Sequence, residues 1–354
     1  MLNQYHNPVI QLDTSEIVAS VDAWDKLRNK AVFITGANGM LGRYCVYTLL
    51  KLNDEQGIGV HVIANVRSLE RGEAVFGDLV ERDDFELKVQ SVDESISYEE
   101  SVDFLIHAAS QASPYYFDND PVGTIKANTL GVFNTLDFAR AKGASYLFVS
   151  TREIYGQPLP DQEWFVESDW GQVNPVDVRS CYSEGKRAGE TIVVSYKKQY
   201  DMDVKIARLS HTYGPGLSLS DARVQAGFAA AIMNDKDIVL KSTGALQRTY
   251  TYIADATAAL FYILLQSDDL VYNIAARNAL VTIKELAEAF IAARPEKHLQ
   301  LVFDLDDKQA KAGWSPVTGG NLDSSRLENL GWQPNVTLLE GIDRTLSFFE
   351  FVDN

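Results

Sequence analysis

Tyr182 and Lys186 are the residues whose types and spacing point most directly to acid–base chemistry. They stand four residues apart, so on a helix they share one face. A phenol normally loses its proton near pH ~10, and an ammonium group beside it favours the phenolate and brings its pKa toward the working range. Such a pair can take the proton from a hydroxyl group while a hydride acceptor oxidises the same carbon. Helices often carry a lysine four residues after a tyrosine on a solvated face. The pair is therefore evidence for catalysis only together with the motifs that precede it.

A glycine-rich turn precedes this pair in the chain. It lies between the apolar segment Ala31–Thr35 and an apolar helical pattern, in the spacing GxxGxxG. Glycine lets the backbone approach a pyrophosphate closely, and a helix N-terminus supplies N–H donors and positive potential. With these flanks, dinucleotide binding is favoured over a merely tight turn. The residues predicted to contact the dinucleotide are Gly36, Asn38, Gly39, Met40, Leu41 and Gly42.

The second predicted strand bears on the choice between NAD and NADP. An acidic residue at its end would hold the adenosine ribose and select NAD. Asn65 stands near that place instead, and Arg67 follows it. Arg67 is compatible with stacking on the adenine, with binding a 2′-phosphate and with a solvated loop position. We therefore predict NAD as the cofactor and leave NADP open.

Thr151 and Glu153 follow another predicted buried strand, at the carboxyl edge where doubly wound sheets bind ligands. Thr151 can hydrogen-bond the hydroxyl group that is oxidised, and Glu153 can act on a proton elsewhere on the substrate. In the alternative interpretation Thr151 caps a helix and Glu153 is a surface charge. Their position at a strand end, before the helix with Tyr182 and Lys186, favours the catalytic interpretation.

Buried strands alternate with helical patterns as far as residue 209, which predicts an α/β fold with a doubly wound parallel sheet. We predict a helical lead-in over residues 1–30, a dinucleotide-binding domain over 31–209 with a returning segment near 248–275, and a smaller α/β substrate-binding lobe over 210–354. The predicted strands are Ala31–Thr35, His61–Val66, Phe85–Val89, Val102–His107, Tyr146–Ser150 and Val204–Leu209. The clearest helical patterns are Pro121–Ala141, Tyr182–Tyr200, Thr282–Arg294 and Leu338–Phe351.

Composition limits the class of protein further. The chain has 354 residues, 46% of them hydrophobic, enough to bury a full core in one large or two closely joined domains. A net charge of -17 argues against a nucleic-acid partner, although a few placed arginines suffice for an anionic small ligand. Cys45 and Cys181 belong to no metal spacing, so we expect free thiols in a reducing compartment and no metal site. With no signal-peptide pattern and no apolar run approaching ~20 residues, we expect a cytoplasmic protein without a membrane partner.

The ordered motifs resemble the extended short-chain dehydrogenase/reductases that modify nucleotide sugars, over residues 31–349 or nearly the whole chain. The resemblance implies a Rossmann-type sheet, bound NAD, a nucleotide-sugar substrate and a homodimer in which helices 121–141 and 182–200 pair across a two-fold axis. Several ordered motifs of this kind rarely coincide by chance. The motifs are Gly36-x-x-Gly39-x-x-Gly42, His107-Ala-Ala-Ser110, Asn128 with Gly131, Ser150-Thr151, Tyr182-x-x-x-Lys186, residues 207–215 and residues 248–255.

Within this family the chain looks most like the UDP-glucuronate decarboxylases, in residues 109–114, 124–131, 173–175 and 179–187. By that resemblance Thr151, Tyr182 and Lys186 oxidise the 4-position of the sugar, and Glu153 assists the later step. The resemblance also assigns Ala108 and Ala109 to the cofactor, Ser110 and Arg223 to the substrate, and Arg248 to the diphosphate.

Two residues depart from the pattern. Arg152 stands where decarboxylases usually carry serine and dehydratases carry aspartate. An arginine stays charged at any working pH and cannot supply the proton that expels water, but it can bind a carboxylate or phosphate as a bidentate fork. His211 stands where the family usually has asparagine beside the substrate, and we predict a hydrogen-bonding or packing role for it rather than metal binding.

These motifs predict an NAD-dependent enzyme that works through a 4-keto sugar and belongs to polysaccharide biosynthesis. Because Glu153 favours chemistry at carbons 5 and 6, decarboxylation of a UDP-uronic acid such as UDP-glucuronate comes first. Epimerisation at the 4-position comes second and 4,6-dehydration third. A cofactor-binding scaffold without activity is disfavoured, because both Tyr182 and Lys186 are present.

Overall fold

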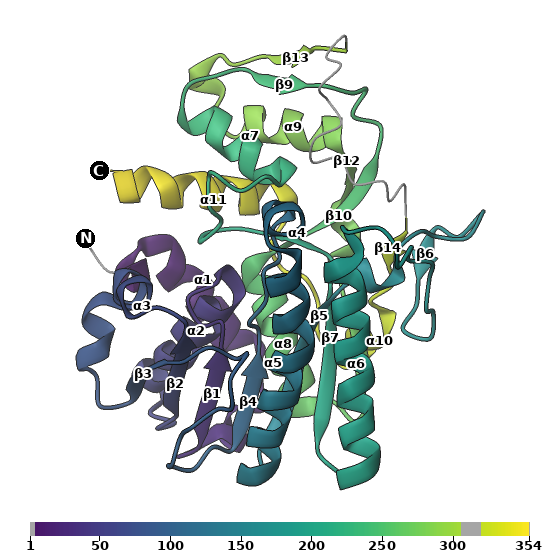
Figure 1. The fold of residues 1–354 in the computed structure, drawn as a ribbon. Helices are drawn as coiled ribbons and strands as arrows, with labels where there is room; N and C mark the ends of the chain where they lie inside the picture. Colours follow the sequence, from purple (N-terminus) through teal and green to yellow (C-terminus); the bar gives the residue numbers. More distant parts are fainter. Residues whose placement is uncertain (1–3, 306–319, 354) are drawn as a thin grey trace.

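A parallel sheet of seven strands forms the centre of the computed structural model, which describes residues 4–305 and 320–353. The strand order is β11-β7-β5-β4-β1-β2-β3, which confirms the doubly wound α/β fold predicted from the alternation of strands and helices. Figure 1 shows α5 and α6 side by side over one face of this sheet. The strands are β1 (Ala31–Thr35), β2 (His61–Val66), β3 (Phe85–Val89), β4 (Phe104–His107), β5 (Ser145–Thr151), β7 (Val204–Leu209) and β11 (Val271–Ile274).

Residues of β1 alternate between two hydrophobic cores, one on each face of the sheet. Val32 and Ile34 belong to the core built with α1, α2 and α8, whereas Phe33 packs with residues of α5 and α6. All five residues of β1 are buried, as expected of a strand covered on both faces. The helices are α1 (Pro8–Ser20), α2 (Met40–Gln56), α3 (Leu69–Phe76), α4 (Pro114–Asn119), α5 (Pro121–Lys142), α6 (Ser180–Tyr200) and α8 (Ile253–Gln266).

A region formed mostly by the second part of the chain, without α8 and β11, lies beyond the carboxyl ends of the strands (Figure 1). Three small sheets belong to this region, β12-β10-β8, β13-β9 and β14-β6. It therefore faces the edge of the main sheet at which doubly wound folds bind ligands. Its elements are β6 (Trp164–Phe165), β8 (His211–Tyr213), α7 (Val224–Met233), β9 (Ile238–Leu240), β10 (Gln247–Tyr252), β12 (Leu280–Thr282), α9 (Ile283–Ala292), β13 (Leu301–Phe303), β14 (Asn321–Leu322), α10 (Ser325–Asn329) and α11 (Leu338–Asp353).

The structure follows the predicted elements closely and adds one strand to the main sheet. The predicted strands and the four clearest helices appear with boundaries shifted by two residues or fewer at most ends. The seventh strand, β11, lies within the segment predicted to return near residues 248–275 and pairs with β7, Ile274 opposite Leu209. The division of the chain at residues 30 and 209 stays a prediction. No helix in the described part of the chain is both long and apolar enough to cross a membrane.

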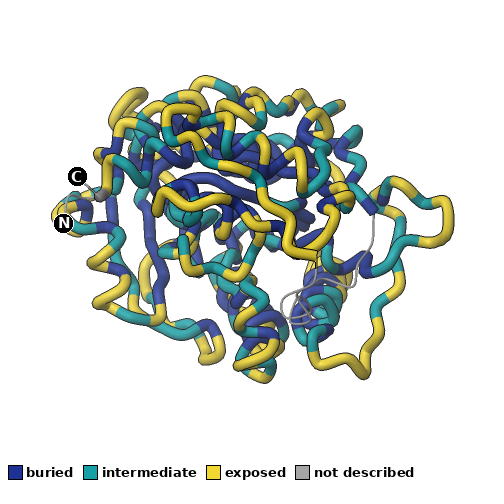
Figure 2. Tube along the Cα trace, turned by 90° about the horizontal axis from the view of Figure 1, so that it is seen from above, coloured by how far each residue is buried: buried dark blue, intermediate teal, exposed yellow. Residues whose placement is uncertain are grey.

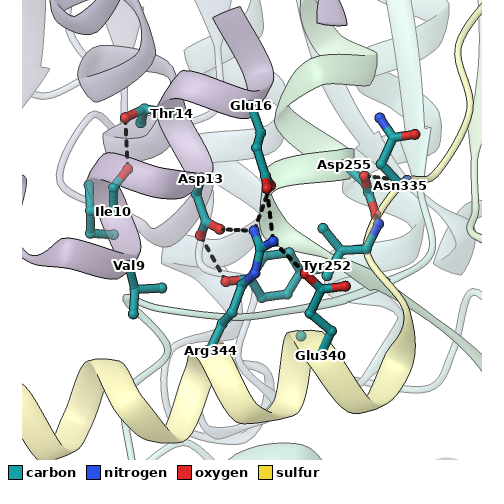
Figure 3. Close-up of polar contacts among 12 residues, drawn as sticks. Val9, Ile10, Asp13, Thr14, Glu16, Tyr252, Asp255, Asn335, Glu340 and Arg344 are labelled. Carbon is teal, nitrogen blue, oxygen red and sulfur yellow. Dashed lines mark hydrogen bonds and ion pairs between the residues drawn. The ribbon is translucent and has the colours of Figure 1, made fainter. Parts of the chain in front are cut away.

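The two ends of the chain meet on one side of the molecule, where α1 packs against α11 (Figures 1 and 2). Asp13 of α1 is fully buried and accepts hydrogen bonds from Tyr44 at 2.7 Å, Tyr252 at 2.8 Å and Arg344 at 2.7 Å (Figure 3). Burial raises the pKa of Asp13 to about 6, against the lowering effect of these three donors. Tyr252 is the last residue of β10, so this buried contact ties both ends of the chain to the strand that carries Arg248.

Candidate active site

The glycine turn joins β1 to α2 at the carboxyl edge of the sheet. Gly36 has a φ of +65°, and a Cβ there would lie 2.7 Å from the Cα of Ala109. A Cβ on Gly42 would lie 2.4 Å from the carbonyl oxygen of Gly36. The turn therefore packs directly on the loop after β4, with no room for side chains at either glycine. Thr35 strengthens this contact, because its hydroxyl accepts a hydrogen bond from the backbone N–H of Ala109 at 3.2 Å.

The N-terminus of α2 is suited to a pyrophosphate. Gly39 is its N-cap residue and makes no side-chain cap hydrogen bond, so Met40, Leu41 and Gly42 present backbone N–H groups that have no partner within the helix. Asn38 adds no side-chain contact here, but its carbonyl oxygen accepts a hydrogen bond from Arg43 at 2.6 Å. The residues present thus fit a dinucleotide at this turn.

At the end of β2, Asn65 has a structural role. Its buried side-chain amide donates to the carbonyl oxygens of Lys88 at 3.4 Å and Gln90 at 3.1 Å, and so links β2 to the end of β3. Arg67 is exposed, and its charge helps to lower the pKa of Asp120 after the larger effects of hydrogen bonds from Gln111 and Gly123. The contact of Arg67 with the cofactor stays a prediction.

Thr151 is the last residue of β5 and also caps a short 3-10 helix over Arg152–Tyr155. Its hydroxyl oxygen accepts a hydrogen bond from the backbone N–H of Glu153 at 3.2 Å. The same side chain lies beside the phenol of Tyr182 and lowers its pKa against the larger effect of burial. Thr151 therefore does cap a helix, as in the alternative interpretation. The cap also fixes its side chain beside Tyr182, so capping does not exclude Thr151 from the site.

Tyr182 and Lys186 both lie on the buried face of α6, as their spacing predicts. The Tyr182 ring stacks on Phe117 with 4.9 Å between centroids. The ammonium of Lys186 donates to the carbonyl oxygen of Val149 at 2.6 Å and lies 4.6 Å from the ring centroid of Phe148. The helix thus places the tyrosine at the end of β5 and the lysine one turn deeper.

The expected lowering of the Tyr182 pKa by Lys186 is wrong for this structure. Burial raises the pKa of Tyr182 to about 12, and the opposing effects come from Thr151 and the Arg223 charge. The Lys186 ammonium is turned to the Val149 carbonyl, and burial lowers its own pKa to about 7. Burial therefore opposes the phenolate form of Tyr182, whereas Thr151 and the Arg223 charge favour it.

Three arginines and a histidine complete the site. Arg152 and Arg248 are buried, and Arg152 donates to the Glu153 carboxylate at 3.1 Å. Burial, then the Arg152 charge, lowers the pKa of Arg248 to about 10. Burial lowers the pKa of His211 well below its usual value, and the charges of Arg152, Arg248 and Arg223 lower it further. The imidazole is therefore neutral within a positively charged group of side chains.

The Ser110 hydroxyl donates to the Asn128 side chain at 3.0 Å. Ala108 and Ala109 border the glycine turn. No group of three or more histidine, cysteine, aspartate or glutamate side chains suited to a metal ion occurs among residues 4–305 and 320–353. The roles assigned to the site residues stay predictions; the glycine turn, Ala108–Ser110 and Arg152–Glu153 directly follow β1, β4 and β5.

Sequence reasoning missed the buried ion pair beneath the site. Glu190 of α6 accepts a hydrogen bond from Ser150 at 2.6 Å and is bound by two nitrogens of Arg208 at 2.7–3.2 Å. Its charge also raises the pKa of Lys186 against the effect of burial. Two features of the sequence could have revealed it. Glu190 stands four residues after Lys186 and so shares its helix face. Arg208 lies in an otherwise apolar strand, where a buried charge needs a partner.

Comparison with known proteins agrees with this geometry. The model of the NAD dependent epimerase/dehydratase family matches residues 32–275. UDP-glucuronic acid decarboxylase 6 of Arabidopsis thaliana is 32% identical over 317 residues, covering 89% of this chain and 87% of that protein. UDP-glucuronic acid decarboxylase 1 of Danio rerio is 30% identical over 328 residues, covering 90% and 72%.

The chain belongs to the NAD-dependent epimerase/dehydratase family. Its cofactor is NAD, and the glycine turn with the N-terminus of α2 fits a dinucleotide. Solved structures agree on the fold: an epimerase from Methanothermobacter thermautotrophicus has a TM-score of 0.78 at 20% identity, covering 95% of this chain and 96% of its own. UDP-glucose 4-epimerase of Thermotoga maritima has a TM-score of 0.76 at 21% identity, covering 92% and 100%.

A methyl group added to the glycine turn tests whether the turn holds NAD. We expect Gly42→Ala to weaken NAD binding at least tenfold, about 1.4 kcal/mol, because its Cβ meets backbone atoms that cannot yield without moving the turn. Gly227→Ala in α7 is the matched control, since its Cβ would have no heavy atom within 4 Å. Calorimetric titration with NAD compares the two variants. Equal affinities would contradict this assignment.

Proposed function

We propose that the chain is a decarboxylase of a UDP-uronic acid such as UDP-glucuronate, working through a 4-keto sugar. The observation that carries the proposal is that Thr151, at the end of β5, lies beside Tyr182, with Glu153 and the buried Arg152 next along the chain. The curated relatives support it, since those found at 30–33% identity over most of the chain are named UDP-glucuronic acid decarboxylases.

The residues divide the chemistry among them. Thr151 holds the 4-hydroxyl of the sugar, and Tyr182 accepts its proton. NAD, when bound, takes the hydride from carbon 4 and later returns it. With a keto group at carbon 4, the bond between carbons 5 and 6 breaks, carbon dioxide leaves, and the electron pair moves onto the 4-oxygen. We assign Glu153 to the transfer of a proton from solvent to carbon 5, and Tyr182 returns its proton to the 4-oxygen when the hydride returns to carbon 4.

The remaining residues bind and orient. We assign Arg223 and Arg248 to the diphosphate, because both are cations near His211 and Arg223 is also near Tyr182. The Lys186 ammonium donates a hydrogen bond to the carbonyl oxygen of Val149 in β5. This bond links α6 to the sheet and so helps to position Tyr182, one turn away. The product would be a nucleotide pentose, a building block for polysaccharide biosynthesis.

Epimerisation at the 4-position is the second candidate. The Arg152–Glu153 ion pair of 3.1 Å favours it, because a glutamate held by an arginine is less available for chemistry at carbon 5. Epimerisation needs only Thr151, Tyr182 and Lys186, with room for the keto sugar to turn over. Dehydration is disfavoured, since Arg152 cannot donate the proton that expels water.

A mass spectrum of the products from UDP-glucuronate and NAD tests the proposal. We expect a product lighter by one carbon dioxide, and loss of nearly all turnover in Tyr182→Phe, which keeps the ring stack on Phe117 but has no proton to exchange. A product of unchanged mass with a new sugar configuration by NMR would replace decarboxylation with epimerisation. Full activity of the phenylalanine variant would overturn the role of Tyr182.

We also infer a homodimer that uses α5 and α6. Both helices expose large apolar side chains, which single soluble chains rarely gather on one surface. We expect light scattering to give about twice the chain mass of 39.4 kDa, and Phe133→Asp to return the mass to that of one chain. A single-chain mass for the unchanged protein at micromolar concentration would refute the dimer. The exposed residues are Val122, Ile125, Leu130, Phe133, Val194 and Tyr200.

We place the enzyme in the cytoplasm. Cys45 and Cys181 are both free thiols, as expected in a reducing compartment. Recovery of the activity from a secreted or membrane fraction of the source cells would refute this location.

A further inference from the structure

Arg43 directly follows the last glycine of the turn, near the start of α2. Its Nη2 atom donates to the carbonyl oxygen of Asn38 at 2.6 Å, and its Nη1 atom donates to the Gln4 side chain at 2.7 Å. Because Asn38 precedes the N-cap residue Gly39, the guanidinium lies at the N-terminal end of the helix. The side chain also borders the loop after β8, since a Cβ on Gly216 would lie 3.3 Å from the Cδ atom of Arg43.

The Arg43 charge has no carboxylate partner in the part of the chain that the structure describes. Its two side-chain hydrogen bonds go to uncharged oxygens, and its Nε atom is buried without a hydrogen bond. Burial lowers the pKa of Arg43, and the groups that oppose this effect are two tyrosines rather than acidic side chains. The buried Arg208 and Arg344 differ, because carboxylates bind each of them.

The place of this charge on the helix makes it unfavourable. The N-terminus of a helix carries a partial positive charge, so a cation there is repelled and an anion is attracted. A guanidinium that is partly removed from water without an anionic partner adds a cost of desolvation. One negatively charged ligand at the turn offsets both effects. NAD, the cofactor of the family, carries such a group in its pyrophosphate.

We propose that Arg43 binds the pyrophosphate of NAD and adds a charged donor to the backbone N–H groups of Met40 and Leu41. A guanidinium presents N–H groups in a planar fork that matches phosphate oxygens. Arg43 is half-buried, so part of the side chain stays accessible at the turn. Its bonds to Asn38 and Gln4 already hold it in place, which reduces the side-chain entropy lost on binding. The proposal concerns the cofactor alone and does not depend on which sugar reaction follows.

Calorimetric titrations with NAD and with adenosine test the proposal without turnover. We expect Arg43→Gln to weaken NAD binding at least roughly tenfold, as the loss of a charge-assisted hydrogen bond does, and to leave the binding of adenosine, which lacks the pyrophosphate, unchanged. Arg43→Lys keeps the charge without the fork and should give an intermediate affinity for NAD. Arg28→Gln is the matched control, because it removes the same charge at an exposed pair with Asp25.

The salt dependence of NAD binding separates an effect of charge from an effect on the shape of the turn. Salt screens the attraction between a guanidinium and a pyrophosphate, so the NAD affinity of the unchanged protein should fall as salt is added. The fall should be shallower in Arg43→Gln, which lacks the charge. A substitution that only distorts the turn would leave the salt dependence as it is in the unchanged protein.

An Arg43→Gln variant that binds NAD as tightly as the unchanged protein would overturn the proposal. An equal loss of NAD and adenosine binding would also overturn it, as would a salt dependence as steep as that of the unchanged protein. Either result would mean that Arg43 supports the shape of the turn without binding the pyrophosphate.

Discussion

The buried carboxylate of Glu190 is the interaction on which the geometry of the active site depends. It joins α6 to β5 through Ser150 and to β7 through Arg208, and both partners lie under the site. Because an unpaired charge in this position would be very costly, the helix can sit on the sheet in only one register. Tyr182 stands eight residues earlier on the same face and is thereby held at the end of β5, beside Thr151. The pair that we propose as catalytic is thus held on the sheet by Glu190, Ser150 and Arg208.

The buried contacts of Asp13 position the strand that carries Arg248. β10 carries Arg248 near its start and Tyr252 at its end, and Tyr252 donates to the buried Asp13 of α1. Arg344 of α11 binds the same carboxylate, so the first and last described helices brace one strand (Figure 3). The N-terminal segment, which precedes the part matched by the family model, is therefore built into the framework that positions Arg248.

Much of this arrangement follows from local sequence patterns. The apolar run of β1 and the glycines after it predict a strand, a turn and a helix, because only glycine fits where Gly36 meets Ala109. The spacing of Tyr182 and Lys186 predicts a shared face. The direction of the Lys186 ammonium is not a local property, since it depends on the Val149 carbonyl brought in by β5. Strand β11 is equally non-local: a four-residue segment becomes a strand because β7 offers it an edge.

The central claim is that a hydride leaves carbon 4 of the sugar and returns to it inside one site built around Thr151 and Tyr182. The most direct test uses UDP-glucuronate with deuterium at carbon 4 and locates the label in the product by NMR. The account predicts that the deuterium is found at carbon 4 of the product, with no net consumption of NAD. Deuterium lost to solvent, or one NAD reduced for each sugar converted, would contradict it.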